Sequence, residues 1–299
     1  MIALNPSPLI TIGIPTYNRA ATLAKNLEII YTQIGNDPDF EVLIINNDSP
    51  DQTESVVMAF KNKYTNLTYL RNDSNIGADF NIYKVIEKSS GKYCLLHGDD
   101  DYFSNNSLQS IKSIIQSHLQ CAIFFINCIK SSDSVVLKQG MNEFLATATH
   151  GVTGMSALIL EKSYFNKIKE PQKFLTTAIN HMYLVYSILE LNPWFVVINR
   201  PYLVSAQAPG QSYNWGKFMI KDYLDILYYF GQRGLNSKYI QQEKLRLLND
   251  VLYWYKRLQE PGWNIDISQT MKYFKDYYKH EPYFRDYYAR LIAINPKYN

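Results

Sequence analysis

Short apolar runs that alternate with helical patterns constrain the fold of this chain more than any other feature of its sequence. Leu9 to Ile14 is a near-continuous apolar run, as expected for a strand that is covered on both faces. One apolar helix face follows it, formed by Leu23, Leu27, Ile30 and Ile34. Such alternation is typical of parallel strands joined by crossover helices. We therefore predict an α/β fold with a mostly parallel central sheet flanked by helices.

The alternation continues along the chain and then gives way to helical patterns alone. Further strands are predicted at 41–45, 67–71, 92–96, 121–126, 155–160 and 194–198, and helices at 78–88, 104–118 and 174–190. Residues 206–215 are rich in turn-forming residues and are expected to form a mobile loop. The sequence thus divides into an α/β domain over 1–214 and a helical C-terminal region over 215–299.

Composition narrows the class of protein. Hydrophobic residues make up 46% and charged residues 19%, which indicates a folded chain. The net charge of +3 is far below the excess of a nucleic-acid binder, so no nucleic-acid partner is expected. Cys94, Cys121 and Cys128 lack paired metal-ligand spacing and are interpreted as reduced core thiols. Without a long apolar stretch or a signal sequence, the chain is predicted to be cytoplasmic.

Tyrosine is unusually frequent, with 25 residues, many of them beyond residue 213 beside Lys, Arg and Trp. Such rings can pack helices together while their hydroxyls reach water. Tyr, Trp and Lys also suit a membrane interface, so peripheral contact of the C-terminal helices with the inner face of the membrane is a second interpretation. The sequence leaves both interpretations open.

Polar clusters follow each of the first four predicted strands. They are Thr16-Tyr17-Asn18, Asn46-Asn47-Asp48, Arg71 to Gly77, and Asp99-Asp100-Asp101. In an open parallel sheet, ligands bind beyond the carboxyl ends of the strands. The four clusters are therefore expected to meet at one edge of the sheet and form a binding site.

The acidic run Asp99-Asp100-Asp101 is the most informative of these clusters. Adjacent carboxylates repel one another unless a positive group lies between them, and a hard divalent cation such as Mg²⁺ or Mn²⁺ suits that position. The alternative is a solvated acidic turn before the helix that starts near Ser104. The position after a buried strand, together with the other three clusters, favours the metal site.

The four segments, in this order and spacing, resemble the family-two glycosyltransferases of the GT-A fold. The resemblance is closer to the branch associated with bacterial surface polysaccharides, which includes abequosyltransferase-like enzymes. It rests on residues 12–19, 44–51, 71–77 and 96–101, and thus covers roughly the first 105 residues. It implies that the domain over 1–214 is catalytic, with a nucleotide-binding half at about 1–105 and an acceptor half at about 106–214.

The resemblance also implies a site for a nucleoside diphosphate sugar. Thr16 and Tyr17 would lie along the nucleoside, with Asn47 or Asp48 at the base. The family usually has an acidic pair followed by glycine at this second segment, so the nucleobase stays open. The donor-binding residues implied are Pro15, Thr16, Tyr17, Asn47, Asp48, Arg71, Asn75, Gly77 and Asp99. The metal ligands implied for Mn²⁺ or Mg²⁺ are Asp99, Asp100 and Asp101, with Asp100 the principal ligand and Asp101 a support or a ligand through water.

The activity implied is a metal-dependent, hexosyltransferase-like transfer in surface polysaccharide synthesis. An acceptor hydroxyl of a glycan or lipid-linked glycan would attack the anomeric carbon in one inverting displacement. This needs a general base, usually a carboxylate at the start of the helix after the acceptor-side strand. Residues 176–184 lack the usual acidic pair, and His181 stands near the expected place.

Several roles stay open at this stage. His181 is either the base, because neutral imidazole accepts a proton near physiological pH, or a structural residue within a packed helix. Glu161 and Glu170 are weaker candidates for the base, and His97 is interpreted as a structural residue that orients the acidic loop. Gly151 and Gly154 form a turn that could approach the acceptor.

Two other classes of function compete with the transferase. A nucleotidyltransferase would also use a parallel sheet and metal-bound carboxylates, but it should carry a glycine-rich basic loop after the first strand, where this chain has Pro15 to Asn18. A non-catalytic protein that binds sugar nucleotides or glycans is the other alternative, favoured if the missing acidic pair means that turnover is lost.

Overall fold

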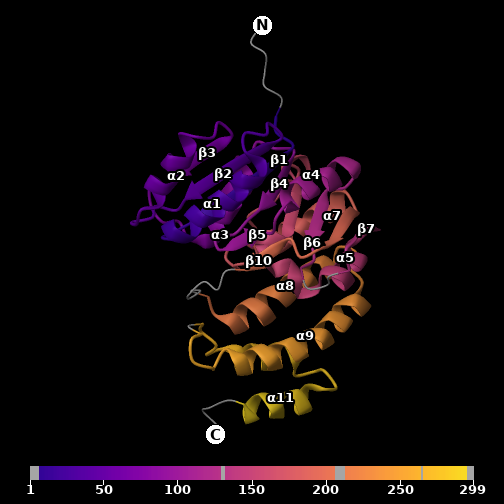
Figure 1. Cartoon of the computed structure of the whole chain (residues 1–299). Helices are drawn as coiled ribbons and strands as arrows, with labels where there is room; N and C mark the ends of the chain where they lie inside the picture. The colour runs from indigo at the N-terminus through magenta and orange to yellow at the C-terminus, as the bar shows by residue number, and fades with distance from the viewer. Residues whose placement is uncertain (1–6, 129–131, 206–212, 264, 295–299) are drawn as a thin grey trace.

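The computed structural model describes residues 7–128, 132–205, 213–263 and 265–294 (Figure 1). In this part of the chain, an eight-stranded sheet with the order β3-β2-β1-β4-β8-β6-β9-β7 forms the centre of the molecule. Its strands are β1 (Ile10–Thr16), β2 (Phe40–Asn46), β3 (Leu67–Arg71), β4 (Tyr93–Leu96), β6 (Ile123–Ile126), β7 (Ser134–Gln139), β8 (Leu158–Glu161) and β9 (Trp194–Asn199). A small second sheet pairs β5 (Asp101–Phe103) with β10 (Leu203–Ser205).

The mostly parallel sheet predicted from the sequence is confirmed. Strands β1 to β4 are mutually parallel, and β1 and β2 are buried along their whole length because helices cover both faces. The exceptions are β8, antiparallel to β4 and β6, and β7, antiparallel to β9. The edge strand β7 was not predicted, because its half-exposed residues carry little apolar signal.

Two groups of helices cover the two faces of the sheet. Helices α1 (Ala20–Ile34), α2 (Thr53–Lys61) and α4 (Ser107–Ser117) contribute to one apolar cluster. Helices α3 (Ala78–Lys88), α5 (Met141–Ala148) and α7 (Asn180–Leu191) contribute to the other, and the short helix α6 (Lys162–Phe165) adds to it at one end. Two 3₁₀ turns, η1 (Thr149–Thr153) and η2 (Met155–Ala157), form the segment that contains Gly151 and Gly154.

Helix α7 begins later than the predicted helix at 174–190. Ala178 lies in the left-handed region with φ of 60°, which L-residues with a Cβ adopt at a cost of about 1–2 kcal/mol. The helix can therefore start only after this residue, at Asn180. Likewise, the strand predicted at 155–160 is confined to β8, because η2 occupies its first residues.

The C-terminal region is helical, as predicted. A π-helical segment, η3, leads into four helices in this described part of the chain, which stack beside the α/β body in Figure 1. The segments are η3 (Lys217–Asp222), α8 (Tyr223–Gly231), α9 (Ser237–Arg257), α10 (Thr270–Tyr278) and α11 (Phe284–Ala293). Their buried side chains join the same apolar cluster as α3, α5 and α7, so the core is continuous. Of the predicted loop at 206–215, residues 206–212 lie outside the described residues.

Ring packing accounts for many of the C-terminal tyrosines. Tyr223 and Tyr278 are fully buried, and Tyr278 stacks on Phe274 with ring centroids 4.9 Å apart. Among the described residues, no helix combines the length and the apolar character that crossing a membrane requires. The three cysteines are free thiols, with Cys94 and Cys121 buried and Cys128 half-buried.

Close packing of α3 on β1 requires glycine at position 13. A Cβ at Gly13 would lie 2.3 Å from Val85 Cγ1. Gly13→Ala is therefore expected to lower the free energy of unfolding by about 1–3 kcal/mol, measured by urea denaturation. The Gly13→Ala/Val85→Ala double variant should recover part of the steric loss. In the control Gly154→Ala, the added Cβ meets its nearest atom at an ordinary 3.5 Å, so a similar loss there would argue against the steric explanation.

Candidate active site

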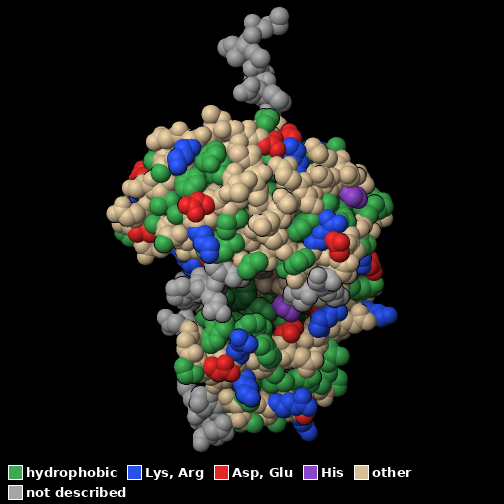
Figure 2. Space-filling model, viewed as in Figure 1, with side chains coloured by type: hydrophobic (Ala, Val, Ile, Leu, Met, Phe, Trp, Pro, Cys, Tyr) green, Lys and Arg blue, Asp and Glu red, His purple; other side chains and the backbone are tan. Residues whose placement is uncertain are grey.

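The four polar clusters meet at the carboxyl edge of β1 to β4, as predicted. The Thr16 hydroxyl at the end of β1 donates to Asp99 Oδ2 after β4 at 2.7 Å. The Asn47 amide after β2 donates to Asn75 Oδ1 in the loop after β3 at 2.8 Å. We call these four loops the rim. Figure 2 shows a hollow between the α/β body and the C-terminal helices, with hydrophobic side chains on its floor.

Asp99 is the most deeply buried carboxylate of the rim. It is 9% exposed, and burial raises its pKa to about 6, against the opposing influence of the Thr16 hydroxyl and of Arg19. Arg19, at the start of α1, donates to Asp100 Oδ2 at 2.7 Å, and its Nη1 lies 3.9 Å from Asp99 Oδ1. Two carboxylates of the acidic run therefore face one cationic group.

Asp101 points elsewhere. Its Oδ2 accepts a hydrogen bond of 2.6 Å from the Ser156 hydroxyl, which in turn accepts the Gly98 N–H at 2.8 Å. Its backbone also begins β5, which pairs with β10. The acidic loop is thus held by Ser156 of η2, and Asp101 supports the loop.

His97 is placed as a residue that orients the acidic loop. It is fully buried, stacks on Phe103 with centroids 4.1 Å apart, and its Nε2 lies 3.1 Å from Asn26 Oδ1. Because Asn26 Nδ2 donates to the Gly98 carbonyl, its Oδ1 is the acceptor and His97 Nε2–H the donor. Burial lowers the pKa of His97 to about 3, which keeps the ring neutral.

Asn47 braces the rim from within. Its Nδ2 donates to Asn75 Oδ1 and, at 3.2 Å, to the Gly77 carbonyl. Its Oδ1 accepts from the Ile76 N–H at 3.0 Å and from Asn72 Nδ2 at 2.8 Å. The Asn47 amide makes four hydrogen bonds within the protein and so links the loop after β2 to the loop after β3. We call this residue the Asn47 strut.

The outer rim carries exposed groups that could meet a nucleoside. Tyr17 is 44% exposed, and its ring can stack on a base. Asp48 has a left-handed backbone with φ of 61°, and its carboxylate pairs with Arg71 Nη2 at 2.8 Å. Arg71 also pairs with Glu54 at 2.5 Å. Pro15 lies buried in β1, directly before Thr16.

The candidates for the base lie in three different places. His181 on α7 is 3% exposed, and its Nε2 lies 2.9 Å from the Thr153 carbonyl, so this nitrogen carries the proton. Burial lowers the pKa of His181 to about 4. Glu161 pairs in register with Tyr93, the first residue of β4, and therefore lies at the amino edge, away from the rim. Glu170 is exposed and pairs with Lys173.

The fit of a divalent cation can be tested on the acidic run. Among the described residues, no three His, Cys, Asp or Glu side chains are grouped to hold a metal ion. Asp99 and Asp100 nevertheless converge on Arg19 Nη1, which shows that their oxygens can face one positive charge. Because Mg²⁺ is often held by one or two carboxylates together with substrate phosphates, these two residues fit such an ion.

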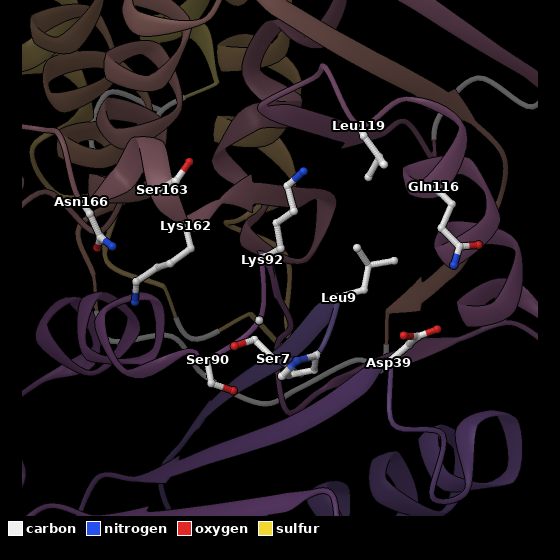
Figure 3. A pocket seen from close by; sticks show the side chains of 12 residues that line it. Ser7, Leu9, Asp39, Ser90, Lys92, Gln116, Leu119, Lys162, Ser163 and Asn166 are labelled. Carbon is white, nitrogen blue, oxygen red and sulfur yellow. The ribbon is translucent and has the colours of Figure 1, made fainter. Parts of the chain in front are cut away.

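A second depression lies at the opposite edge of the sheet, where the parallel strands begin. An open groove of about 620 Å³ is lined by Leu9, Asp39 and Lys92, among others (Figure 3). These residues precede β1, β2 and β4, so the groove lies at the amino edge. Of its lysines, Lys162 donates to the carbonyls of Ile86 and Glu87 at the end of α3. This groove is therefore separate from the rim.

Several residues of the site carry no signal in the sequence. Arg19 lies within a recognised segment, but its pairing with Asp100 spans 81 residues of chain. Asn26 and Ser156 reach the acidic loop from α1 and η2, over 72 and 58 residues respectively. Pattern analysis places residues on elements but does not report which elements lie face to face, so these contacts required coordinates.

Comparison with known proteins agrees with this arrangement. Residues 11–182 match the sequence family described as Glycosyl transferase family 2. The abequosyltransferase RfbV of Salmonella typhimurium is 27% identical over 206 residues, which cover 60% of this chain and 61% of that protein. The poly(ribitol-phosphate) β-N-acetylglucosaminyltransferase TarS of Staphylococcus aureus is 23% identical over 251 residues, or 80% of this chain and 43% of that protein. The matched parts thus span less than two thirds of these relatives.

Solved structures show the same fold. Residues 1–349 of S. aureus TarS in complex with UDP-GlcNAc give a TM-score of 0.60 at 16% identity, covering 95% of this chain and 83% of that one. The mannosyltransferase PcManGT from Pyrobaculum calidifontis, in complex with GDP-Man and Mn²⁺, gives 0.57 at 14% identity, covering 98% and 87%. Because the family match runs from β1 into α7 and takes in every loop of the rim, the chain belongs to glycosyl transferase family 2, and its fold is GT-A.

Proposed function

We propose that this glycosyltransferase moves a sugar from a nucleoside diphosphate sugar to a hydroxyl of a glycan or lipid-linked glycan, in the synthesis of a bacterial surface polysaccharide. The observation that carries the proposal is the pair of carboxylates, Asp99 and Asp100, that face one positive charge where all four rim loops end. RfbV is named as an abequosyltransferase, and TarS as a poly(ribitol-phosphate) β-N-acetylglucosaminyltransferase. Both names support the class of reaction.

The rim residues divide into three roles in this proposal. Tyr17, Asp48 and Arg71 contact the nucleoside, because their side chains are exposed at the outer rim. Asn75 and Gly77 shape the wall near the sugar, with Asn47 as the strut that holds them. The third role, held by the acidic run, is contact with the diphosphate.

We assign Mn²⁺ or Mg²⁺ as the cofactor, held by Asp99 and Asp100, with Asp101 supporting the loop. When bound, the ion supplies positive charge that offsets the charge developing on the departing diphosphate. The protein's own contribution is to keep the two carboxylates close together, through the Thr16 hydroxyl on Asp99 and the Ser156 contact beneath the loop. The proposed displacement proceeds in one step and inverts the anomeric centre.

Thermal shift measurements test the metal and donor site together. UDP or GDP with Mn²⁺, at about 100 times the dissociation constant, should stabilise the protein by about 2.7 kcal/mol and raise its Tm. Neither nucleotide is expected to do so without Mn²⁺ or Mg²⁺. Asp100→Ala should remove the response, because it takes away one of the two carboxylates that face the cation site.

A matched control is Asp286→Ala, which removes an exposed carboxylate on α11. This variant should keep the metal-dependent response of the unaltered protein. Metal-dependent stabilisation that survives in Asp100→Ala would show that the ligand is wrongly assigned, and stabilisation that needs no metal would refute the metal site.

We also propose that the C-terminal helices touch a membrane surface at their aromatic end. Arg257, at the end of α9, lies over the rings of Trp254 and Trp263 with its Cζ 5.8 Å from each centroid. Tyr253 and Trp263 are 55% and 42% exposed. Such a mixture of cationic and amphipathic aromatic side chains suits lipid headgroups. Co-sedimentation with anionic vesicles, lost in Trp263→Ala, is the corresponding measurement.

A further inference from the structure

The sequence at the start of α7 lacks the acidic pair that would supply a general base. The fold, however, brings a carboxylate to that place from another element. Asp79 lies in the first turn of α3, and its Oδ2 accepts a hydrogen bond of 3.0 Å from the N–H of Ala178. Ala178 precedes α7 by two residues, and the contact spans 99 residues of chain. This carboxylate thus stands between the nucleotide-binding half and the acceptor half.

The position of α3 places Asp79 on the rim. Helix α3 packs on β1, β2 and β4 and contacts α7 alongside. It begins directly after Gly77, whose carbonyl accepts from the Asn47 strut, so its first turn lies at the carboxyl edge of the sheet. Helix α7 leads into β9, which runs in the direction of β6 and β4, so it also starts at this edge. Both helix starts therefore flank the rim.

The surroundings of Asp79 hold one of its oxygens and leave the other available. The Ala178 N–H anchors Oδ2, while no described residue donates a hydrogen bond to Oδ1. Charged groups face it from the C-terminal region: Lys217 and Asp222 of η3, which pair with each other at 2.5 Å. Lys217 also reaches the Thr176 carbonyl in the loop before α7. The Ala178 N–H therefore holds the carboxylate, and the charged pair on η3 lies close enough to influence it.

The left-handed conformation of Ala178 is consistent with this anchoring. A residue with a Cβ adopts φ of 60° only where its surroundings compensate the cost. The hydrogen bond from its N–H to a half-buried carboxylate is such a compensation. Burial raises the pKa of Asp79, with Ala178 N–H and Lys217 opposing and Asp222 reinforcing the shift. A half-buried carboxylate of raised pKa is a better proton acceptor than an exposed one.

We propose that Asp79 is the general base of the transfer, an inference that rests on the proposed function. In the step, Asp79 Oδ1 takes the proton of the acceptor hydroxyl, and the hydroxyl oxygen forms its bond to the anomeric carbon. The bond from that carbon to the diphosphate oxygen breaks, and its electron pair leaves with the nucleoside diphosphate. Asp79 ends as a neutral carboxylic acid and the leaving group carries one additional negative charge. His181, with Nε2–H bound to Thr153, is then a positioning residue for the start of α7.

The test is release of UDP from UDP-GlcNAc, or of GDP from GDP-mannose, with Mn²⁺ and with an alkyl glycoside as the hydroxyl acceptor. Asp79→Asn keeps an oxygen that can accept from the Ala178 N–H, so the fold and the nucleotide-dependent thermal shift should not change. Its kcat should fall by about 10²–10⁴-fold with the donor KM unchanged, and Asp79→Glu should restore part of it. In the unaltered protein, kcat should fall at acid pH as Asp79 takes up a proton; the residual activity of Asp79→Asn should lack this dependence.

Two comparison variants separate the outcomes. His181→Gln should keep most of the turnover, and Asp276→Asn, an exposed carboxylate on α10, should keep all of it. Full turnover in Asp79→Asn, or loss of turnover in His181→Gln with Asp79→Asn active, would overturn the assignment while leaving the proposed function intact. Absence of turnover by the unaltered protein with both donors would instead refute the proposed function, and the assignment with it.

Discussion

The Asp99→Asn variant is expected to lose sugar transfer by a factor of about 100–1,000, as when one preorganised electrostatic partner is removed from an active site, and yet to be more stable than the unaltered protein. The loss of transfer follows from removing one of the two carboxylates that face the proposed cation site. The gain in stability follows from burial. Thr16 can still donate to the amide oxygen, so the local hydrogen bond is kept.

The gain should depend on pH in a defined direction. Burial raises the pKa of Asp99 from 3.8 to about 6 in the folded protein, so the folded state holds its proton more tightly than the unfolded chain. This favours the folded state below about pH 4, and the advantage is lost as pH rises through about 6. The asparagine side chain is neutral throughout. The stability of the variant relative to the unaltered protein should therefore rise by about 1–3 kcal/mol between pH 4 and pH 7.

Urea denaturation in the presence of a chelator, at both pH values, measures this difference. A variant that is no more stable relative to the unaltered protein at pH 7 than at pH 4 would show that Asp99 does not carry the burial penalty. Transfer that stays above about a tenth of the original rate would remove Asp99 from the active site, because losses at such sites are about 100-fold or more.

The second large effect is expected within the C-terminal helices. Lys244 on α9 has a side chain that is only 4% exposed and pairs with Glu281, which follows α10. Its Nζ also donates to the Tyr277 carbonyl at 3.2 Å. Lys244→Met keeps the apolar stem but leaves Glu281 without its partner, which should cost about 3–5 kcal/mol of unfolding free energy.

Two further variants identify the cause of that loss. Lys244→Met/Glu281→Leu removes both charges and should recover most of the stability, because a buried pair replaced by apolar side chains is often neutral. Arg290→Met breaks the exposed pair with Asp286 on α11, whose side chains are 57% and 60% exposed; this should cost less than about 1 kcal/mol. Equal losses in Lys244→Met and Arg290→Met would rule out burial as the reason.

Much of the sheet and of the rim follows from local sequence. Strands such as β1 and β2 are covered on both faces, and runs of apolar residues in the sequence predict that burial directly. The order of strands and helices then places the four loops at one edge, without knowledge of any side-chain contact. The pairing of Thr16 with Asp99 could therefore be anticipated as proximity, although not as a hydrogen bond.

The remaining features depend on contacts between distant segments. The delayed start of α7 follows from the left-handed Ala178, which no propensity predicts for alanine. Its partner Asp79 belongs to a helix pattern in which an acidic residue in the first turn is ordinary. The edge strand β7 and the short pair β5–β10 have too few buried residues to leave a periodic pattern. Tertiary contacts determine each of these features, and such contacts cannot be predicted from the local sequence of a single chain.

The apolar cluster that α7 shares with the C-terminal helices limits how this protein can diversify. Ile220, Leu224 and Leu227 are fully buried in the same cluster as Tyr186 and Leu184 of α7. Exchanging the C-terminal helices for those of a relative would therefore also replace side chains that pack against α7. New specificities are therefore more accessible through substitutions in the loops than through exchange of the C-terminal region. A fragment that ends at residue 214 would expose the apolar side chains of α7 and its neighbours to water and aggregate.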